Sequence, residues 1–231
     1  MLLETTKEIP IRKGVMVVIF KDRTDAGRLL AEKLAGRIGK DGVVLAIPRG
    51  GVVVGAELAR KLGLKLDLII PRKIGSPQNP EVALGAIAQD GAAILDRRLI
   101  ELLGVTDAEL KEIMTYELEE IKRRMSLYRG SANHRNYTGK QIVVVDDGIA
   151  TGYTMLAALR SARNLRPREL ILAIPVAPPE TLEILKKEVE HSVCLLTPAN
   201  FYAVGQFYES FDQTDDEEVV KILKELKEIE K

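Results

Sequence analysis

The chain has 231 residues, of which 46% are hydrophobic and 29% charged, a size and composition typical of one globular domain with an elaboration. Its formal net charge is zero, which argues against non-specific binding to nucleic acid or to a membrane surface. The single cysteine, Cys194, excludes an intrachain disulfide, and the lack of a signal peptide or of any long apolar run predicts a soluble, cytoplasmic protein.

Apolar runs alternate with segments of helical spacing along most of the chain. The first part of the chain is predicted to form a strand at 15–20, a helix at 25–38, a strand at 43–47, a helix at 55–62 and a strand at 66–70. The middle part is predicted to form a loop at 72–81, a hairpin from 82–88 and 92–95, helices within 96–128 and a polar excursion at 129–140. The last part is predicted to form a strand at 141–145, a helix at 154–164, a strand at 170–176, a helix at 180–189, a strand at 192–196 and a charged helix from 215. Most of the strands are apolar throughout, as expected of strands buried on both faces of a sheet. The order predicts an α/β fold with a doubly wound, mainly parallel sheet, in which ligands bind beyond the carboxyl ends of the strands.

Side-chain signals add detail at the helix ends. Asp22 or Thr24 can cap the first helix, and Thr106 and Glu109 have the spacing of a capping box. A basic stretch near the end of the long helical region is expected to be a solvated helix face; it consists of Arg123, Arg124, Arg129 and Arg135.

The segment 143–154, VVVDDGIATGYT, is the most informative in the chain. Asp146 and Asp147 stand where a buried strand leaves the sheet, and adjacent ionised carboxylates there need hydrogen-bond donors. The turn that follows opens a helix, so its backbone amides and the hydroxyls of Thr151 and Thr154 can hold an anion. The segment therefore predicts a sugar-phosphate site, in which the carboxylates take sugar hydroxyls and the loop takes the phosphate. An ordinary strand-turn-helix with solvated aspartates and a metal site are the alternatives.

A second segment follows the strand at 43–47. Arg49 can bind an anion through two hydrogen bonds from its guanidinium, and Gly50 and Gly51 let backbone amides reach the same anion. A plain strand-to-helix turn with a surface arginine is the alternative.

A third segment, the loop at 72–81, follows the next strand. Arg72 and Lys73 are mobile cations at its start, and its two prolines and one glycine suit a lid that opens and shuts over a site. A solvated loop with an ordinary basic pair is the alternative.

The three segments together resemble the type I phosphoribosyltransferases. The motif of that family for 5-phosphoribosyl 1-pyrophosphate (PRPP) has apolar residues, two acidic residues, a short turn and Thr-Gly-x-Thr, as at 143–154. The resemblance covers roughly residues 43–196, with the motifs in family order, and is greatest to an uncharacterised bacterial and archaeal branch. Arg72-Lys73 followed by glycine and proline is most like the adenine phosphoribosyltransferases.

The resemblance implies an enzyme that moves 5-phosphoribosyl from PRPP to a nitrogenous base or similar acceptor and releases pyrophosphate. Mg²⁺ would be the cofactor, bound mainly through PRPP and not by direct ligation to the protein. Asp146 and Asp147 would hold the ribose hydroxyls. The 5-phosphate would lie on the loop made of Gly148, Ile149, Ala150, Thr151, Gly152, Tyr153 and Thr154. The pyrophosphate would contact Arg49, Gly50, Gly51, Arg72 and Lys73, and the peptide geometry near Arg49 is often unusual in the family.

The family selects its acceptor with a variable hood, for which we expect residues 197–214 here. Aromatic rings in this segment can stack on a flat acceptor or pack the hood against the sheet; the candidates are Phe201, Phe207 and Tyr208. Glu81, in the lid, is a candidate acid/base residue at the acceptor; a solvated surface glutamate is the alternative. Ala150 stands where the hypoxanthine and guanine branch has an aspartate, which disfavours a 6-oxopurine acceptor.

The expected organisation is a single phosphoribosyltransferase domain over 1–231, with a helical insertion at 96–140 that could form a homodimer interface. The rival functions are a non-catalytic PRPP-binding regulator and a PRPP synthase. No nucleic-acid or membrane partner is expected, and no ATP site for a synthase is visible.

Overall fold

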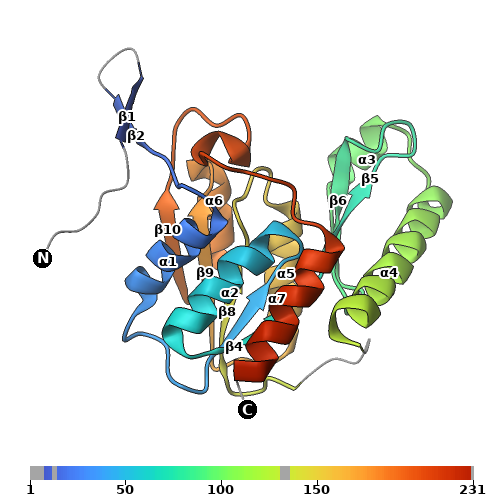
Figure 1. The fold of residues 1–231 in the computed structure, drawn as a ribbon. Coiled ribbons are helices and arrows are strands. Elements are labelled where there is room, and N and C mark those ends of the chain that lie inside the picture. The colour runs from blue at the N-terminus through green and yellow to red at the C-terminus, as the bar shows by residue number, and fades with distance from the viewer. Residues whose placement is uncertain (1–7, 12–14, 131–135, 230–231) are drawn as a thin grey trace, which may run out of the picture.

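A five-stranded parallel sheet forms the centre of the computed structural model, which describes residues 8–11, 15–130 and 136–229 (Figure 1). The strand order is β10-β9-β8-β3-β4. These strands are β3 (Val43–Ala46), β4 (Lys65–Leu68), β8 (Gln141–Val145), β9 (Glu169–Val176) and β10 (His191–Leu196). All four pairings are parallel, and β3 and β8 are buried at every residue, as their continuous apolar sequences predict.

Helices cover both faces of this sheet. On one face lie α1 (Arg23–Leu34), α2 (Gly50–Leu62) and the C-terminal α7 (Asp216–Ile229); on the other lie α5 (Tyr153–Asn164), α6 (Pro179–Leu185) and the 3₁₀ turn η1 (Lys186–Glu188). Alternate residues of β3 point to opposite faces, so that Val44 packs with the first group and Leu45 with the second. The prediction of a doubly wound, mainly parallel α/β sheet is confirmed.

A smaller antiparallel sheet lies beside the main one, at the right of Figure 1. Its strands are β5 (Arg72–Gly75), β6 (Ala83–Ile87) and β7 (Ala93–Leu95), and the helices next to it are α3 (Arg97–Leu102) and α4 (Asp107–Arg129). The predicted hairpin is confirmed as β6 and β7, and so is the capping box at Thr106. The loop predicted at 72–81 is wrong over its first four residues, because they pair with β6 as a strand.

Other element boundaries also differ from the predicted ones, most clearly at β2 (Val15–Val18), α1 and α2. The predicted strand at 15–20 is seen as β2, which pairs with β1 (Glu8–Ile11). Asp22 caps α1 as expected, but the helix ends at Leu34, four residues early. Helix α2 begins at Gly50 instead of residue 55, so the glycine pair forms its first turn.

The strand order reverses between β3 and β8. The chain proceeds from β3 through α2 to β4 in one direction, and from β8 through α5 and α6 to β9 and β10 in the other. In such sheets the crevice at this switch point, beyond the carboxyl ends of the two strands, is where ligands bind. The two most informative segments of the sequence both begin at this crevice.

A buried ion pair ties the end of α4 to the edge strand of the main sheet. The Arg129 Nε lies 2.7 Å from the Asp67 Oδ1, and their side chains are only 5% and 4% exposed. The Tyr137 hydroxyl donates to the same carboxylate. The expectation that Arg129 belongs to a solvated basic face is therefore wrong, whereas Arg123 is exposed and pairs with Glu120 on its own helix. Arg135, the last member of that stretch, lies outside the described residues.

Replacing Arg129 with methionine should lower the free energy of unfolding by about 3 kcal/mol or more, because it leaves a buried carboxylate without its cation. The control is Arg168→Met, which removes an exposed arginine 3.5 Å from Asp41 and should change stability by about 0.5 kcal/mol or less. Urea denaturation measures both. Equal losses in the two variants would contradict the assignment.

Candidate functional site

The glycine pair at the start of α2 lies directly against the two aspartates that follow β8. A Cβ atom built on Gly50 would be 2.0 Å from the Asp147 Oδ2, and one built on Gly51 would be 2.8 Å from the Asp146 Oδ1. Neither position has room for a side chain, so the backbone of the turn packs on the carboxylates. The structure thus brings together two segments that are almost a hundred residues apart in sequence.

Asp147 is held by two hydrogen bonds from distant parts of the chain. Its Oδ2 accepts a hydrogen bond of 2.7 Å from the Arg23 Nε, and the two side chains are 11% and 16% exposed. Its backbone carbonyl accepts a hydrogen bond of 2.5 Å from the Tyr208 hydroxyl. Burial, followed by the nearby Asp147 charge, raises the pKa of Tyr208, so this hydroxyl keeps its proton for the bond.

Asp146 has no such cation beside it. Its Oδ1 accepts from the Asp147 backbone amide at 2.8 Å. Burial and then the neighbouring Asp147 charge raise the pKa of Asp146 well above its ordinary range. A carboxylate in this state gains from any ligand that brings hydrogen-bond donors or positive charge.

The loop after the aspartates presents the N-terminus of α5 to the same crevice. Gly152 caps the helix with φ +84°, and a Cβ there would be 2.7 Å from the Thr181 Cγ2. The Thr181 hydroxyl donates to the Ala150 carbonyl at 3.0 Å, and this bond ties the loop to α6. Ala150 and Thr151 are exposed, whereas the Ile149 amide donates to the Val176 carbonyl at 2.9 Å, so the amides after Ile149 are the ones that can receive an anion.

Tyr153 links this loop to the smaller sheet. Its hydroxyl donates to the Asp96 Oδ2 at 2.9 Å, and Asp96 also caps α3 by accepting from the Leu99 amide. The hydrogen bond to Asp96 raises the pKa of Tyr153. The side chain of this motif residue is therefore engaged in the fold, and its backbone amide is the part available to a ligand.

Arg49 lies at the edge of the crevice and faces α7. The Pro48–Arg49 peptide bond is cis, in line with the unusual geometry that the resemblance implies at this turn. The Arg49 Nη1 is 3.6 Å from the Asp216 Oδ1, which also accepts from the Tyr128 hydroxyl at 2.6 Å. Burial and the bond to Asp216 raise the pKa of Tyr128 to about 12.

The cations predicted in a lid are instead on strand β5. Arg72 donates to Glu117 of α4 at 2.6 Å, and its side chain is 26% exposed. Lys73 is more exposed and lies 3.4 Å from Glu81. Both cations thus have carboxylate partners, and neither lies on a free loop.

The hood aromatics mostly pack against the body of the protein. Phe207 and Tyr208 are 2% and 6% exposed and form a cluster with Phe20, and the Phe201 ring lies 5.5 Å from the Phe207 ring. Phe207 is the last residue of the 3₁₀ turn η2 (Val204–Phe207), Tyr208 directly follows this turn, and Phe201 precedes it. Because both rings are buried, Phe207 and Tyr208 pack the hood against the rest of the protein in this structure, and their faces are not open to an acceptor.

Two residues at this site had no signal in any motif. Arg23, the first residue of α1, places its guanidinium 3.9 Å from the centre of the Phe211 ring and donates to the Asp212 carbonyl at 2.6 Å. Phe211 is 37% exposed. Only the tertiary fold brings the start of α1 to the acidic pair, so spacing along the chain could not reveal it.

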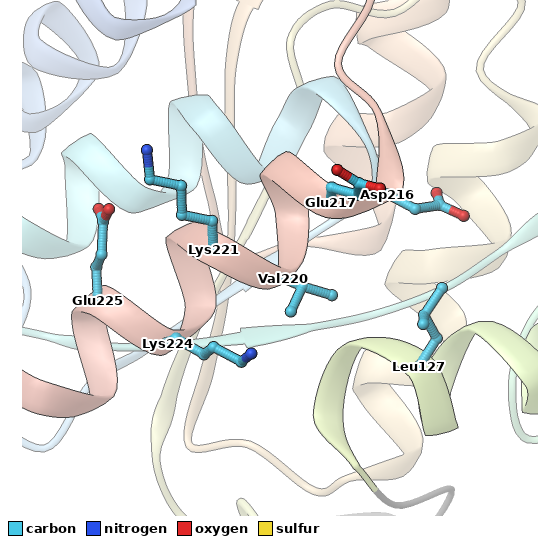
Figure 2. Close-up of a pocket in the computed structure, with 7 residues that line it drawn as sticks. All are labelled: Leu127, Asp216, Glu217, Val220, Lys221, Lys224 and Glu225. Carbon is cyan, nitrogen blue, oxygen red and sulfur yellow. The ribbon is translucent and has the colours of Figure 1, made fainter.

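Two surface hollows lie near these groups. One, of about 320 Å³, adjoins the glycine turn and is lined by Arg23, Arg49, Gly50, Phe211, Asp212, Gln213 and Thr214. A larger one, of about 510 Å³, lies between α4 and α7, where Leu127 faces Val220 (Figure 2). The larger hollow contains none of the predicted site residues, so size does not locate the chemistry here.

The described residues contain no group of three or more His, Cys, Asp and Glu side chains that could hold a metal ion by themselves. Asp146 and Asp147 place two adjacent carboxylates at the crevice. Their acceptor oxygens suit Mg²⁺ that arrives on a polyphosphate ligand. Among the described helices, none is both long and apolar enough to cross a bilayer.

A family model described as "Phosphoribosyl transferase domain" matches residues 21–210. The chain belongs to this family. It is similar to two Mycobacterium tuberculosis proteins, of strains CDC 1551 / Oshkosh and ATCC 25618 / H37Rv, that are provisionally named phosphoribosyl transferases. Identity to each is 42% over 205 residues, which is 89% of this chain and 46% of the relative. The chain thus spans about half the length of these relatives.

A solved structure shares the fold of this chain over most of its length. TT1426 from Thermus thermophilus is 40% identical, with a TM-score of 0.75, and the match covers 90% of this chain and 99% of that one. The family model begins at residue 21, two residues before Arg23, and ends at residue 210, just before Phe211. Helix α7, which carries Asp216, lies beyond it.

Asp146→Asn should stabilise the protein near pH 7, with a melting temperature higher by about 2 °C or more. A carboxyl whose folded-state pKa is raised loses stability as pH rises above its unfolded value, so the gain should vanish near pH 4. Calorimetry across this pH range measures it.

Asp147→Asn is the matched control for that measurement. It removes the charge that compensates the largely buried Arg23 guanidinium, so it should lower the melting temperature at pH 7. Shifts of the same sign in both variants would contradict the different environments assigned to the two aspartates.

Proposed function

We propose that this protein is a PRPP-dependent phosphoribosyltransferase that transfers 5-phosphoribosyl to a small nitrogenous acceptor and releases pyrophosphate. The carrying observation is the contact of Gly50 and Gly51 with Asp147 and Asp146 at the switch point of the sheet. At this one point the protein offers two carboxylates to a sugar diol, the N-terminus of α5 to the sugar phosphate and the N-terminus of α2 to a leaving group. We assign the reaction to nucleotide salvage in the cytoplasm.

The acidic pair would hold the ribose. Asp146 and Asp147 accept hydrogen bonds from the two ring hydroxyls and offset the positive charge that develops on the ring as its bond to pyrophosphate breaks. The amides of the turn from Ala150 to Thr154 hold the 5-phosphate at the start of α5, since the Ile149 amide is already bonded to the Val176 carbonyl. These groups are in place before the ligand arrives, so they reorganise little during the reaction.

The leaving group would lie on the first turn of α2. The amides of Gly50 and Gly51 and the guanidinium of Arg49 stabilise the charge that builds on pyrophosphate. The leaving group would gain further positive charge from Mg²⁺ bound with PRPP. For Arg72 and Lys73 to join them, β5 would have to move toward the crevice and exchange Glu117 and Glu81 for the ligand.

The acceptor nitrogen would attack the anomeric carbon from the side of the hood, and its proton would leave to solvent or to a base. Ala150 stands where an aspartate serves the 6-oxopurine branch, so this class is disfavoured, while alanine is common in the adenine and uracil branches. With Phe207 and Tyr208 covered, Phe201 and Phe211 are the rings of the hood that we assign to this side.

A PRPP-binding regulator is the second candidate. The pairing of Arg72 and Lys73 with carboxylates, away from a free lid, is the observation that favours it. A regulator needs tight binding but no closure over a leaving group. A PRPP synthase would need an ATP site, for which the described residues offer no support.

Pyrophosphate release from PRPP and Mg²⁺ with a panel of nitrogenous bases tests the function directly. At least one base should give turnover, and Asp147→Asn should cut it about 100-fold or more, because it loses one preorganised charge contact. Asp41→Asn, at an exposed carboxylate with only a 3.5 Å contact to Arg168, should match the wild type. Tight PRPP binding without turnover on any base would favour the regulator.

A further inference from the structure

Arg23 is built into the acidic site although no motif contains it. Its Nε donates to the Asp147 Oδ2 at 2.7 Å, on the same side as the Gly50 backbone, where an added Cβ would be 2.7 Å from that Nε. This hydrogen bond engages only Oδ2 of the two Asp147 carboxylate oxygens. The ion pair therefore fixes one oxygen in the protein and leaves the other for a ligand.

The guanidinium is itself held by the hood. It stacks on Phe211 at 3.9 Å, and its Nη1 donates to the Asp212 carbonyl at 2.6 Å. Both partners follow closely after Tyr208, whose hydroxyl binds the Asp147 carbonyl. The hood thus holds Asp147 in two ways. Its Tyr208 binds the Asp147 backbone carbonyl, and its residues 211 and 212 hold the Arg23 guanidinium that binds the Asp147 carboxylate. Together these contacts fix the rotamer of the Asp147 carboxylate.

The repulsion between the two aspartates explains why a cation is needed beside them. Asp146 and Asp147 are adjacent and repel each other when both are ionised. Arg23 is the cation in closest contact with them, and its side chain is only 11% exposed, so solvent screens the interaction weakly. Without it, the two carboxylates would turn apart or one would take up a proton, and either change would spoil a pair of acceptors aimed at neighbouring hydroxyls.

We propose that Arg23 is a positioning residue that gives this site its selectivity for a sugar phosphate with a cis-diol. It holds the Asp147 carboxylate beside that of Asp146 at the spacing that two cis hydroxyls require. The inference rests on the proposed function, because it concerns the sugar end of the same site. It adds a residue at the start of α1 and a role for the hood that does not involve the acceptor.

Calorimetric titration with three sugar phosphates tests the proposal. Ribose 5-phosphate has the cis-diol, 2-deoxyribose 5-phosphate lacks one hydroxyl, and arabinose 5-phosphate has the two hydroxyls trans. The wild type should prefer ribose 5-phosphate by about tenfold or more, the scale for one hydrogen bond to a charged group. Arg23→Gln should reduce that preference to about twofold or less, and Arg23→Lys should restore part of it.

Arg28→Gln is the matched control, since Arg28 lies on the same helix and pairs with Asp25 and Glu32 at the surface. It should keep the full preference for ribose 5-phosphate. Phe211→Leu keeps the guanidinium but removes the ring that supports it, so its preference should fall between those of the wild type and Arg23→Gln. This variant replaces a partly exposed ring and serves if Arg23→Gln does not fold.

The outcomes distinguish this inference from the proposed function. A general weakening of all three sugars with an unchanged ratio, in Arg23→Gln or in Phe211→Leu, would mean a merely structural role and would overturn the inference alone. A wild type that binds neither ribose 5-phosphate nor PRPP would overturn the proposed function, and the inference with it.

Discussion

The close contact between the first turn of α2 and the two carboxylates after β8 is the constraint on which the site depends. A single added carbon at Gly50 would be 2.0 Å from the Asp147 Oδ2, so the turn is confined to glycine. The parallel pairing of β3 with β8 sets this approach, because it ends both strands at one edge of the sheet. The ends of two helices and two negative charges then share one crevice, and a phosphorylated sugar with hydroxyls and a second anionic group matches that arrangement.

The ionised aspartates in this crevice lower the stability of the folded state. Asp146 has a raised pKa because burial and a neighbouring charge both disfavour its ionised form. Strongly perturbed groups of this kind gather at functional sites, where a ligand relieves the cost that folding leaves in place. Asp147 is different, since Arg23 and the hood hold it in place. One aspartate is thus poised for a ligand, while the other is oriented by the protein.

The sequence was informative where chemistry depends on neighbours along the chain. The buried strands, the turn at Gly152 and the Gly50-Gly51 pair follow from local patterns, although α2 begins five residues before its predicted start. Contacts between distant segments could not be read in this way. Arg23 looks like any helical arginine until α1 is packed, and Arg129 looks solvated until it meets Asp67. Phe207 and Tyr208 are aromatic, but only the fold decides whether a ring faces a ligand or a core. The residues at 72–75 have loop signals nearby, yet pairing with β6 overrides them.

We infer that the two aspartates and the two helix N-termini form one PRPP site. A crystal structure of the protein with PRPP and Mg²⁺ tests this most directly. We expect the two ribose hydroxyls about 3 Å or less from the carboxylate oxygens of Asp146 and Asp147, the 5-phosphate at the start of α5 and the pyrophosphate beside Gly50 and Gly51. Ribose hydroxyls turned away from both aspartates, or PRPP bound in the hollow between α4 and α7, would contradict it.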